Sequence, residues 1–176
     1  MLRRSRAATA AVATVLATAL VAVPETAQAQ QSTVTDAAGD TFRPGLDFTS
    51  VTVRNADRAV VFTLRFVRDR PGEVIVNVKP RHGSRAIIVS RHRRSGPDKL
   101  LFVARDGQPC SGLSSDWSRR AATLQLRMPA RCLNGGNYGA VRFWGLVEGP
   151  SSGGDVDYTS ETPDGDIRFS EWVPRG

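Results

Sequence analysis

The chain has 176 residues, with 24 Lys or Arg against 17 Asp or Glu, and its formal net charge at pH 7 is +7. Arg outnumbers Lys by 22 to 2, a bias that a GC-rich coding genome explains more simply than selection for guanidinium chemistry. The basic charge is therefore weak evidence for nucleic-acid binding, and we expect no nucleic-acid partner. The length is enough for one domain with a hydrophobic core and too short for two.

Residues 1–29 have the three parts of an export signal. Three of the first six residues are Arg, an uncharged stretch rich in Ala and Val runs over 7–24, and Ala27-Gln28-Ala29 is a small-x-small cleavage site. The stretch is short and Ala-dominated for a retained membrane anchor, so we expect cleavage; the general secretory and twin-arginine routes both stay open. The prediction is a secreted protein without a membrane anchor, beginning at Gln30 and forming a single domain over 30–176.

Apolar and polar residues alternate in short runs that turn residues separate, which is the pattern of β-strands with one buried face. In the clearest run, Val60, Phe62, Leu64 and Phe66 point one way. No helical stripe of useful length occurs, so we predict an all-β fold, an antiparallel β-sandwich or jelly roll. The seven predicted strands are 46–53, 59–67, 73–79, 85–91, 99–105, 122–128 and 140–147; edge pairing is expected at 167–173 and within the irregular segment 30–45.

The two cysteines, Cys110 and Cys132, both lie in the part of the chain that is expected outside the cell. In an oxidising compartment such a pair forms a disulfide, which in the chain-entropy model contributes about 3 kcal/mol for a loop of this size. His82 and His92 lie well before the cysteines, so the four residues match zinc-ligand spacing poorly. We predict a disulfide.

Acidic residues gather at the two ends of the expected mature chain. Asp36 and Asp40 lie near one end, and Asp155 and Asp157 lie near the other. Ca²⁺ takes six to eight oxygen ligands from carboxylates and loop carbonyls, so these four residues are candidate ligands of one structural calcium ion if the two ends meet. The default interpretation is that Asp and Gly only make turns here, because Asp accepts local backbone hydrogen bonds and Gly allows positive φ.

Two basic segments, 79–85 and 91–94, flank the predicted strand 85–91. As loops at the two ends of one strand they would not form one compact patch. Attraction of anionic glycans or envelope polymers is one interpretation of these segments, and ordinary solvated loops are the default.

Exposed aromatic rings would matter for a sugar ligand, because the apolar face of a sugar ring stacks on Trp or Tyr. Trp117 and Tyr138 lie in loop-like stretches and Tyr158 lies in the tail, and these three are the candidate ligand-binding residues. Trp144 lies in a strong strand, where a core position is expected, and Trp172 lies in the tail. In a small sandwich, packing is the commoner role of an aromatic ring.

Catalysis has little support in the sequence. It contains no His-Glu-x-x-His motif, no phosphate loop and no cysteine outside the predicted disulfide. Both His residues lie among Arg and are expected to be exposed in loops. Asp164 and Asp166 offer a carboxylate pair for a glycosidase, but their closeness in a Gly-rich tail is weak support. We expect no enzyme activity and no catalytic residues.

One stretch of the chain is similar to a known family. The motif Asp36-x-x-Gly39-Asp40, followed by Leu46-Asp47-Phe48-Thr-Ser-Val51-x-Val53 and Ala59-Val-Val-Phe-Thr-Leu64, resembles the opening of secreted bacterial β-sandwich domains related to family 9 carbohydrate-binding modules. The resemblance covers residues 35–67. It implies a sandwich fold with sugar binding and calcium, although the tryptophans that sandwich the sugar in that family have no match in this chain.

These observations predict a secreted, monomeric, non-catalytic domain that binds a carbohydrate or a cell-envelope component. Its expected partner is a glycan or envelope polymer, and the only expected cofactor is structural calcium. One alternative is a structural or protein-interaction protein of the envelope, which recruits a partner through an exposed edge strand. A secreted hydrolase, which would need two carboxylates in a cleft, is the less favoured alternative.

Overall fold

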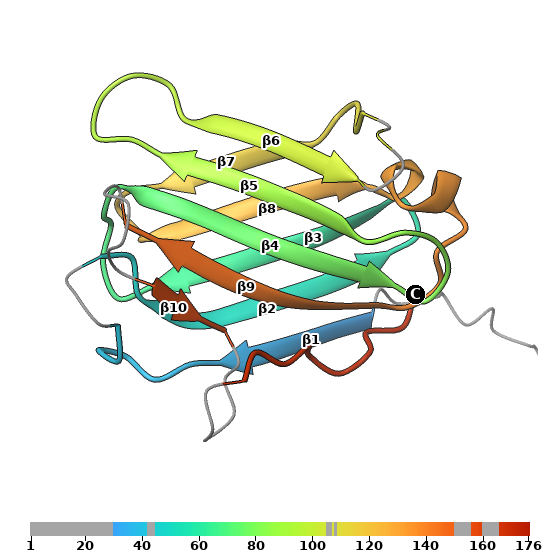
Figure 1. The fold of residues 1–176 in the computed structure, drawn as a ribbon, viewed down its shortest axis with the longest axis horizontal. Coiled ribbons are helices and arrows are strands. Elements are labelled where there is room, and N and C mark those ends of the chain that lie inside the picture. The colour runs from blue at the N-terminus through green and yellow to red at the C-terminus, as the bar shows by residue number, and fades with distance from the viewer. Residues whose placement is uncertain (1–29, 42–44, 105–106, 108, 150–155, 160–165) are drawn as a thin grey trace, which may run out of the picture.

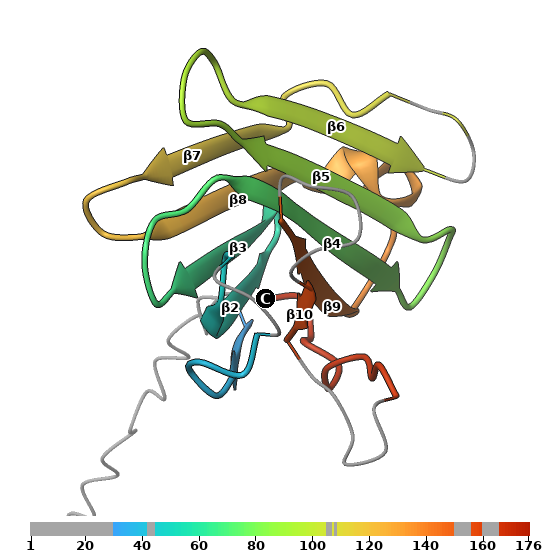
Figure 2. The ribbon, with the colours of Figure 1, turned by 60° about the vertical axis from the view of Figure 1, so that its left-hand side comes forward.

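The computed structural model describes residues 30–41, 45–104, 107, 109–149, 156–159 and 166–176. Within them, ten strands form two antiparallel five-stranded sheets, which are ordered β1-β2-β3-β8-β7 and β10-β9-β4-β5-β6 and face each other as two layers (Figures 1 and 2). The predicted antiparallel β-sandwich is confirmed. The strands are β1 (Gln30–Thr35), β2 (Phe48–Ala56), β3 (Ala59–Phe66), β4 (Gly72–Pro80), β5 (Ala86–His92), β6 (Lys99–Ala104), β7 (Ser114–Ser118), β8 (Thr123–Pro129), β9 (Val141–Glu148) and β10 (Val156–Tyr158).

Five of the sequence predictions involve residues outside the described part of the chain. These are the export signal over 1–29, positions 42–44 of the irregular segment, position 105 of the fifth predicted strand, the candidate calcium ligand Asp155, and Asp164 of the possible glycosidase pair. Among the described residues, no helix is long and apolar enough to cross a membrane.

The hydrophobic core lies between the two sheets. Phe62 of β3 meets Phe143 of β9 edge to face, with 5.6 Å between the ring centroids, and both rings are buried. Each such side chain contributes about 1.5–3 kcal/mol when it is fully removed from water. The predicted inward faces are confirmed for β3, β4 and β8, whose buried residues include Val60, Phe62, Leu64, Phe66, Val74, Val76, Val78, Leu124, Leu126 and Met128.

The first predicted strand departs from simple alternation. Phe48, Val51 and Val53 are all buried, although alternation would place Phe48 on the opposite side from the two valines. The register of β2 against β3 shifts between Phe48 and Ser50. A bulge of this kind inserts an extra residue into one strand, so the side chains before and after it reach the same face.

The outer edge of β9 is covered by segments from the end of the chain. β10 pairs with residues 146–148, and the N–H of Thr159 donates to the carbonyl of Gly145 at 3.0 Å. Further along, the N–H of Ser170 donates to Phe143 at 2.7 Å, and Val173 forms an isolated bridge with Val141. The predicted edge pairing at 167–173 is therefore found as this short contact.

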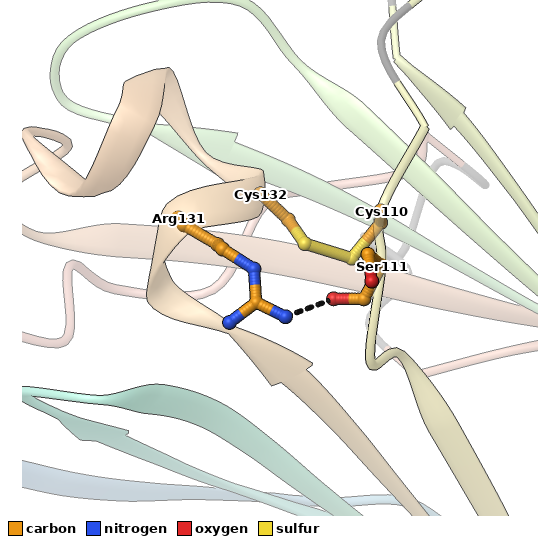
Figure 3. Close-up of a disulfide and its surroundings, with 4 residues drawn as sticks. All are labelled: Cys110, Ser111, Arg131 and Cys132. Carbon is orange, nitrogen blue, oxygen red and sulfur yellow. Dashed lines mark hydrogen bonds between the residues drawn. A yellow bond between two sulfur atoms is a disulfide. The ribbon is translucent and has the colours of Figure 1, made fainter.

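Cys110 and Cys132 form the predicted disulfide (Figure 3). It joins the stretch before β7 to the 3₁₀ turn Ala130–Cys132 that follows β8. The neighbouring Arg131 reaches the same stretch, because its guanidinium donates to the carbonyl of Ser111 at 2.6 Å. Both sulfur atoms are used in this bond, which excludes the zinc alternative for the pair.

Candidate functional site

The structure brings acidic residues from the two ends of the described chain together. Asp36 and Asp40 follow β1, and Asp157 lies in β10, whose position is set by pairing with β9. One carboxylate oxygen from each of the three lies within 4.8 Å of the other two. Figure 1 shows β10 beside the segment that follows β1. The sequence predicted this meeting of Asp36, Asp40 and Asp157.

Asp47, which was not among the predicted ligands, lies beside these three carboxylates, and its charge helps to raise the pKa of Asp36 and of Asp157; the four residues are called the acidic cluster below. The residue surface of Asp47 is only 8% exposed. One oxygen, Oδ2, accepts a hydrogen bond of 2.9 Å from the N–H of Gly39, which lies between Asp36 and Asp40. Its other oxygen, Oδ1, is buried without a hydrogen-bond partner, as is Oδ2 of Asp36.

The carboxylates of the cluster disfavour one another's charge. Burial, followed by the charge of Asp40, raises the pKa of Asp36 to about 6. Burial is also the main cause that raises the pKa of Asp157 to about 7, with the charges of Asp36, Asp40 and Asp47 adding to it. The N–H of Phe48 acts in the opposite direction, because it donates to Asp157 Oδ2 at 2.7 Å and stabilises the ionised form.

Calcium fits this donor set. A hard cation binds carboxylate oxygens, and two of the oxygens here are buried acceptors that the fold leaves without a partner. Leaving such an acceptor unpaired costs about 1–3 kcal/mol, and mutual repulsion adds to that cost. A bound cation would remove both penalties. Asp36, Asp40, Asp47 and Asp157 are the described residues that would hold it.

The second sheet presents a largely apolar face to solvent. The side chains of β4, β5, β6 and β9 that point away from the core lie in rows across the strands, and Figure 1 looks onto this face, with no described element in front of these strands. Leu101 and Val103 are 57% and 48% exposed. One row is Tyr158, Leu146, Ile75, Val89 and Leu101, and the next is Trp144, Asn77, Ile87 and Val103.

Trp144 and Asn77 lie opposite each other on this outer face. Trp144 is half-buried and points away from the core, so it is not a core residue. Asn77 is 8% exposed, and its Oδ1 is buried without a hydrogen-bond partner. An aromatic ring therefore stands directly beside an acceptor that the fold does not use.

Of the predicted ligand-binding aromatics, the structure places only Tyr158 on this face, where it lies opposite Leu146. Tyr138 is fully buried, and its hydroxyl donates to Asn55 Oδ1 at 2.8 Å, so this ring is a core residue and offers no surface to a ligand. Its sequence neighbours are loop residues, which made it look exposed.

Trp117 lies in β7 and not in a loop, and its half-buried ring packs within the protein. It stacks on Phe66 at 5.5 Å and on His92 at 4.3 Å between ring centroids, and its Nε1–H donates to Ser90. The expectation that His92 is an exposed loop residue is also wrong. The residue is 2% exposed and places its two ring nitrogens within 3.0 Å of Asp69 and Asp98 carboxylate oxygens.

Comparisons of the chain with protein-family models, with curated proteins and with solved structures found no match. The resemblance to family 9 carbohydrate-binding modules stays a prediction. Of the residues on which it was based, Asp36, Gly39, Asp40 and Asp47 lie together in the acidic cluster.

Proposed function

We propose that the chain is an exported, non-catalytic domain that binds a carbohydrate of the cell envelope on the outer face of its second sheet. The observation that carries this proposal is the juxtaposition of Trp144 with the unpartnered amide oxygen of Asn77. A sugar ring has an apolar face that stacks on an aromatic ring, and hydroxyl groups at its edge that donate hydrogen bonds. Trp144 is half-buried and offers the stacking surface, and the amide of Asn77 lies beside it; because Asn77 Oδ1 is buried, a sugar hydroxyl would reach it only after the neighbouring side chains move.

The surroundings of the pair support the same ligand class. Tyr158 lies on the same face and supplies a second aromatic ring, and it also carries a hydroxyl. The sheet holds these side chains on paired strands, and strands give more precise positions than loops. The apolar rows extend over four strands, which is the kind of surface that a chain of sugar rings covers and a single small polar molecule does not.

Retention of the secreted protein on a panel of insoluble polysaccharides and on a glycan array tests the proposal. Trp144→Ala should weaken binding at least about tenfold, because loss of one stacking contact and its buried area is worth about 1.4 kcal/mol or more. Val61→Ala, on the outer face of the first sheet, is the matched control and should bind like wild type. Failure to bind any polysaccharide, or equal binding by W144A, would rule the proposal out.

We further infer that the acidic cluster holds a structural calcium ion. The ion would supply positive charge to four carboxylates and use the two unpartnered oxygens. Its protein ligands come from the segment after β1, from the start of β2 and from β10, which belong to both sheets. Calcium would therefore connect the layers and hold β10, and with it Tyr158, in place on the binding face.

Protein interaction is a second candidate function, and one observation favours it. β6 is the last described strand of the second sheet, and it carries the two most exposed large aliphatic residues, Leu101 and Val103. Exposed apolar residues on a free edge strand are typical of surfaces that pair with another chain. Under this alternative, Leu101→Lys would abolish capture of a protein partner and W144A would leave it intact.

A further inference from the structure

Next to the proposed sugar-binding face, four cations gather that form no ion pair with another described residue. Lys79 of β4 and Arg142 of β9 are direct cross-strand partners, and they form the row beyond Asn77 and Trp144. Arg81 and Arg85 lie in the connection between β4 and β5. Within the described part of the chain, none of these four forms an ion pair, whereas the surface pair Arg91 and Glu73 at the other end of the face does.

Two aromatic rings of the C-terminal tail hold the cations in place. The Phe169 ring centroid lies 4.9 Å from the Arg142 Cζ, 5.2 Å from the Arg85 Cζ and 6.0 Å from the Lys79 Nζ. The Trp172 ring lies 4.8 Å from the Arg142 Cζ and 5.3 Å from the Arg81 Cζ. Ring contacts position a guanidinium, but they do not neutralise its charge, and they leave N–H donors for other partners.

This arrangement costs stability unless an anion is present. Like charges at directly opposed positions of a sheet destabilise it, and Lys79 faces Arg142 in this way. The repulsion also lowers the pKa of Lys79, for which Arg142 is the largest cause. In addition, Arg142 Nε is buried and has no hydrogen-bond partner. A bound carboxylate or phosphate would relieve the repulsion between Lys79 and Arg142.

We propose that the basic end formed by Lys79, Arg81, Arg85 and Arg142 makes the site selective for acidic polysaccharides, whose sugar units carry carboxylate or phosphate groups. The inference rests on the proposed carbohydrate function and names its ligand class. A hollow of about 490 Å³ opens between Lys79, Gly83, Ser84 and Arg85, which is within the size range of small-ligand sites. It offers room for the anionic group beside the cations.

The position of the cations favours a polysaccharide over other polyanions. Lys79 follows Asn77 by two residues on β4, and Arg142 precedes Trp144 by two residues on β9. Residues at this spacing lie on the same face of a strand, about 6–7 Å apart. The anion-binding groups and the ring-stacking groups are therefore close enough to contact one ligand. An anionic membrane would need the charge but would not use a single Trp beside an amide, whereas the bases of a nucleic acid also stack on aromatic rings, so DNA is included in the test.

The closing experiment compares polymers that differ only in charge. Polygalacturonate and its fully methyl-esterified form share one sugar backbone, and a glycerol phosphate polymer provides the phosphate arm. The secreted protein should bind at least one acidic polymer about tenfold more tightly than the ester, and added salt should reduce this preference. The acidic polymer that binds identifies which anion is recognised.

Two double variants test whether the residues of the basic end cause the preference for acidic polymers. Lys79→Gln with Arg85→Gln should lose the preference for the acidic polymer by about tenfold and keep the affinity for the ester. Arg65→Gln with Arg127→Gln removes the same charge from exposed positions on the first sheet, and should keep the preference. Thermal unfolding of each variant verifies that it is folded, and the salt dependence of wild type gives a readout that needs no variant.

The outcomes that would overturn the selectivity proposal differ from those that would overturn the proposed carbohydrate function. If neither polygalacturonate nor the glycerol phosphate polymer binds more tightly than the ester, the selectivity is overturned. In that case, weaker binding of polygalacturonate and its ester by W144A would still support the proposed carbohydrate function. Equal binding of duplex DNA or of anionic phospholipid vesicles, lost in the same variant, would overturn selectivity for polysaccharides, because charge alone would then be recognised. Absence of binding to acidic, esterified and neutral polysaccharides would overturn both proposals.

Discussion

Asn77 buries an amide oxygen for which the fold provides no donor, whereas Asn55 of β2 uses its amide fully. The Asn55 amide accepts from the Tyr138 hydroxyl at 2.8 Å and donates to the Val173 carbonyl at 2.9 Å. The two residues have the same chemistry and similar burial, and they differ in whether folding satisfies them. Substitutions of these two residues can therefore distinguish an amide that stabilises the fold from an amide that is free to bind a ligand.

Asn77→Leu should leave the free energy of unfolding unchanged or raise it by about 1 kcal/mol, because an unpartnered polar group is replaced by an apolar one of similar size. It should also weaken polysaccharide binding. Asn55→Leu should lower the free energy of unfolding by about 2–4 kcal/mol, because it removes the buried hydrogen bonds of the Asn55 amide with the Tyr138 hydroxyl and the Val173 carbonyl. Urea unfolding measures both. A strong destabilisation by N77L would show that the amide serves folding.

The carboxylates of Asp36 and Asp157 give the ion-free protein a characteristic pH dependence. Their pKa values of about 6 and about 7 lie above the ordinary value near 3.8, so between these limits the folded state binds more protons than the unfolded state. In calcium-free buffer, stability should therefore rise as the pH falls from 7.5 to 5.5. The melting temperature measures this rise, and Asp157→Asn should reduce it. A melting temperature that falls over the same interval would contradict the electrostatic account.

At the residue scale, the sequence predicted which acidic residues meet, but it did not predict all the members of the cluster. Asp36, Asp40 and Asp157 could be selected because sandwich termini often converge. Asp47 was placed at the start of the first predicted strand, and its hydrogen bond from Gly39 places it beside the other acidic residues. The aromatics were harder to place, since side-chain exposure depends on neighbours distant in sequence. Tyr138 is covered by β2 and the tail, whereas Trp144 projects from its strand.

At the scale of elements, the acidic cluster links the segment after β1, the start of β2 and β10. If calcium binds only the folded state, then a free concentration of 100 times its Kd stabilises that state by about 2.7 kcal/mol. For a domain of this size the melting temperature should rise by roughly 5–10 °C. Differential scanning calorimetry with calcium and with a chelator measures this change.

Asp47→Asn and Asp157→Asn should reduce or abolish that calcium-dependent rise, and Asp116→Asn, at an exposed position of β7, should preserve it. The D47N variant is the sharper test, because Asp47 Oδ1 is buried without a hydrogen-bond partner and Asp47 was not among the ligands predicted from the sequence. If calcium leaves the melting temperature unchanged in wild type, then the acidic residues act as turn residues, as the default interpretation held.

The disulfide connects the stretch before β7 to the 3₁₀ turn after β8. Replacing both cysteines, Cys110→Ser and Cys132→Ser, should lower the free energy of unfolding by about 3 kcal/mol, because the unfolded chain regains the freedom of the closed loop. Guanidinium unfolding of the oxidised wild type and of the variant measures the difference. A loss below about 1 kcal/mol would show that the Arg131–Ser111 hydrogen bond and the packing of β7 hold this region without the disulfide.

The elements that the sequence predicted are those with a strong apolar alternation. All seven predicted runs correspond to strands, since each buries one face in the core. The alternation predicted neither β7 nor β10, and the residues of β1 fell within the segment 30–45 that was expected to be irregular. They lie at the ends of their sheets, where a strand has one neighbour and buries little, so polar sequences such as Gln30–Thr35 suffice. Their position follows from backbone pairing, and composition gives little indication of it.

At the scale of the whole molecule, the two outer faces differ in character. The first sheet exposes Arg54, Arg65 and Arg127, and the second presents its apolar rows and the basic end. The alternation in the sequence separates inward from outward residues on each strand, but it does not reveal which outward residues become neighbours. That information comes from the sheet order, which places β9 beside β4 although about 60 residues separate them along the chain. The binding face could not be predicted for this reason.

The covering of β9 by the end of the chain has a consequence for solubility. Ser170 and Val173 occupy backbone groups of Phe143 and Val141, which would otherwise form an open edge beside the apolar outer face. An open edge with apolar neighbours is a template for pairing with other chains, and such pairing leads to aggregation. Loss of residues 166–176 by proteolysis would thus do more than remove Phe169 and Trp172 from the basic end. It would turn a shielded strand into a site where molecules of this protein add to one another.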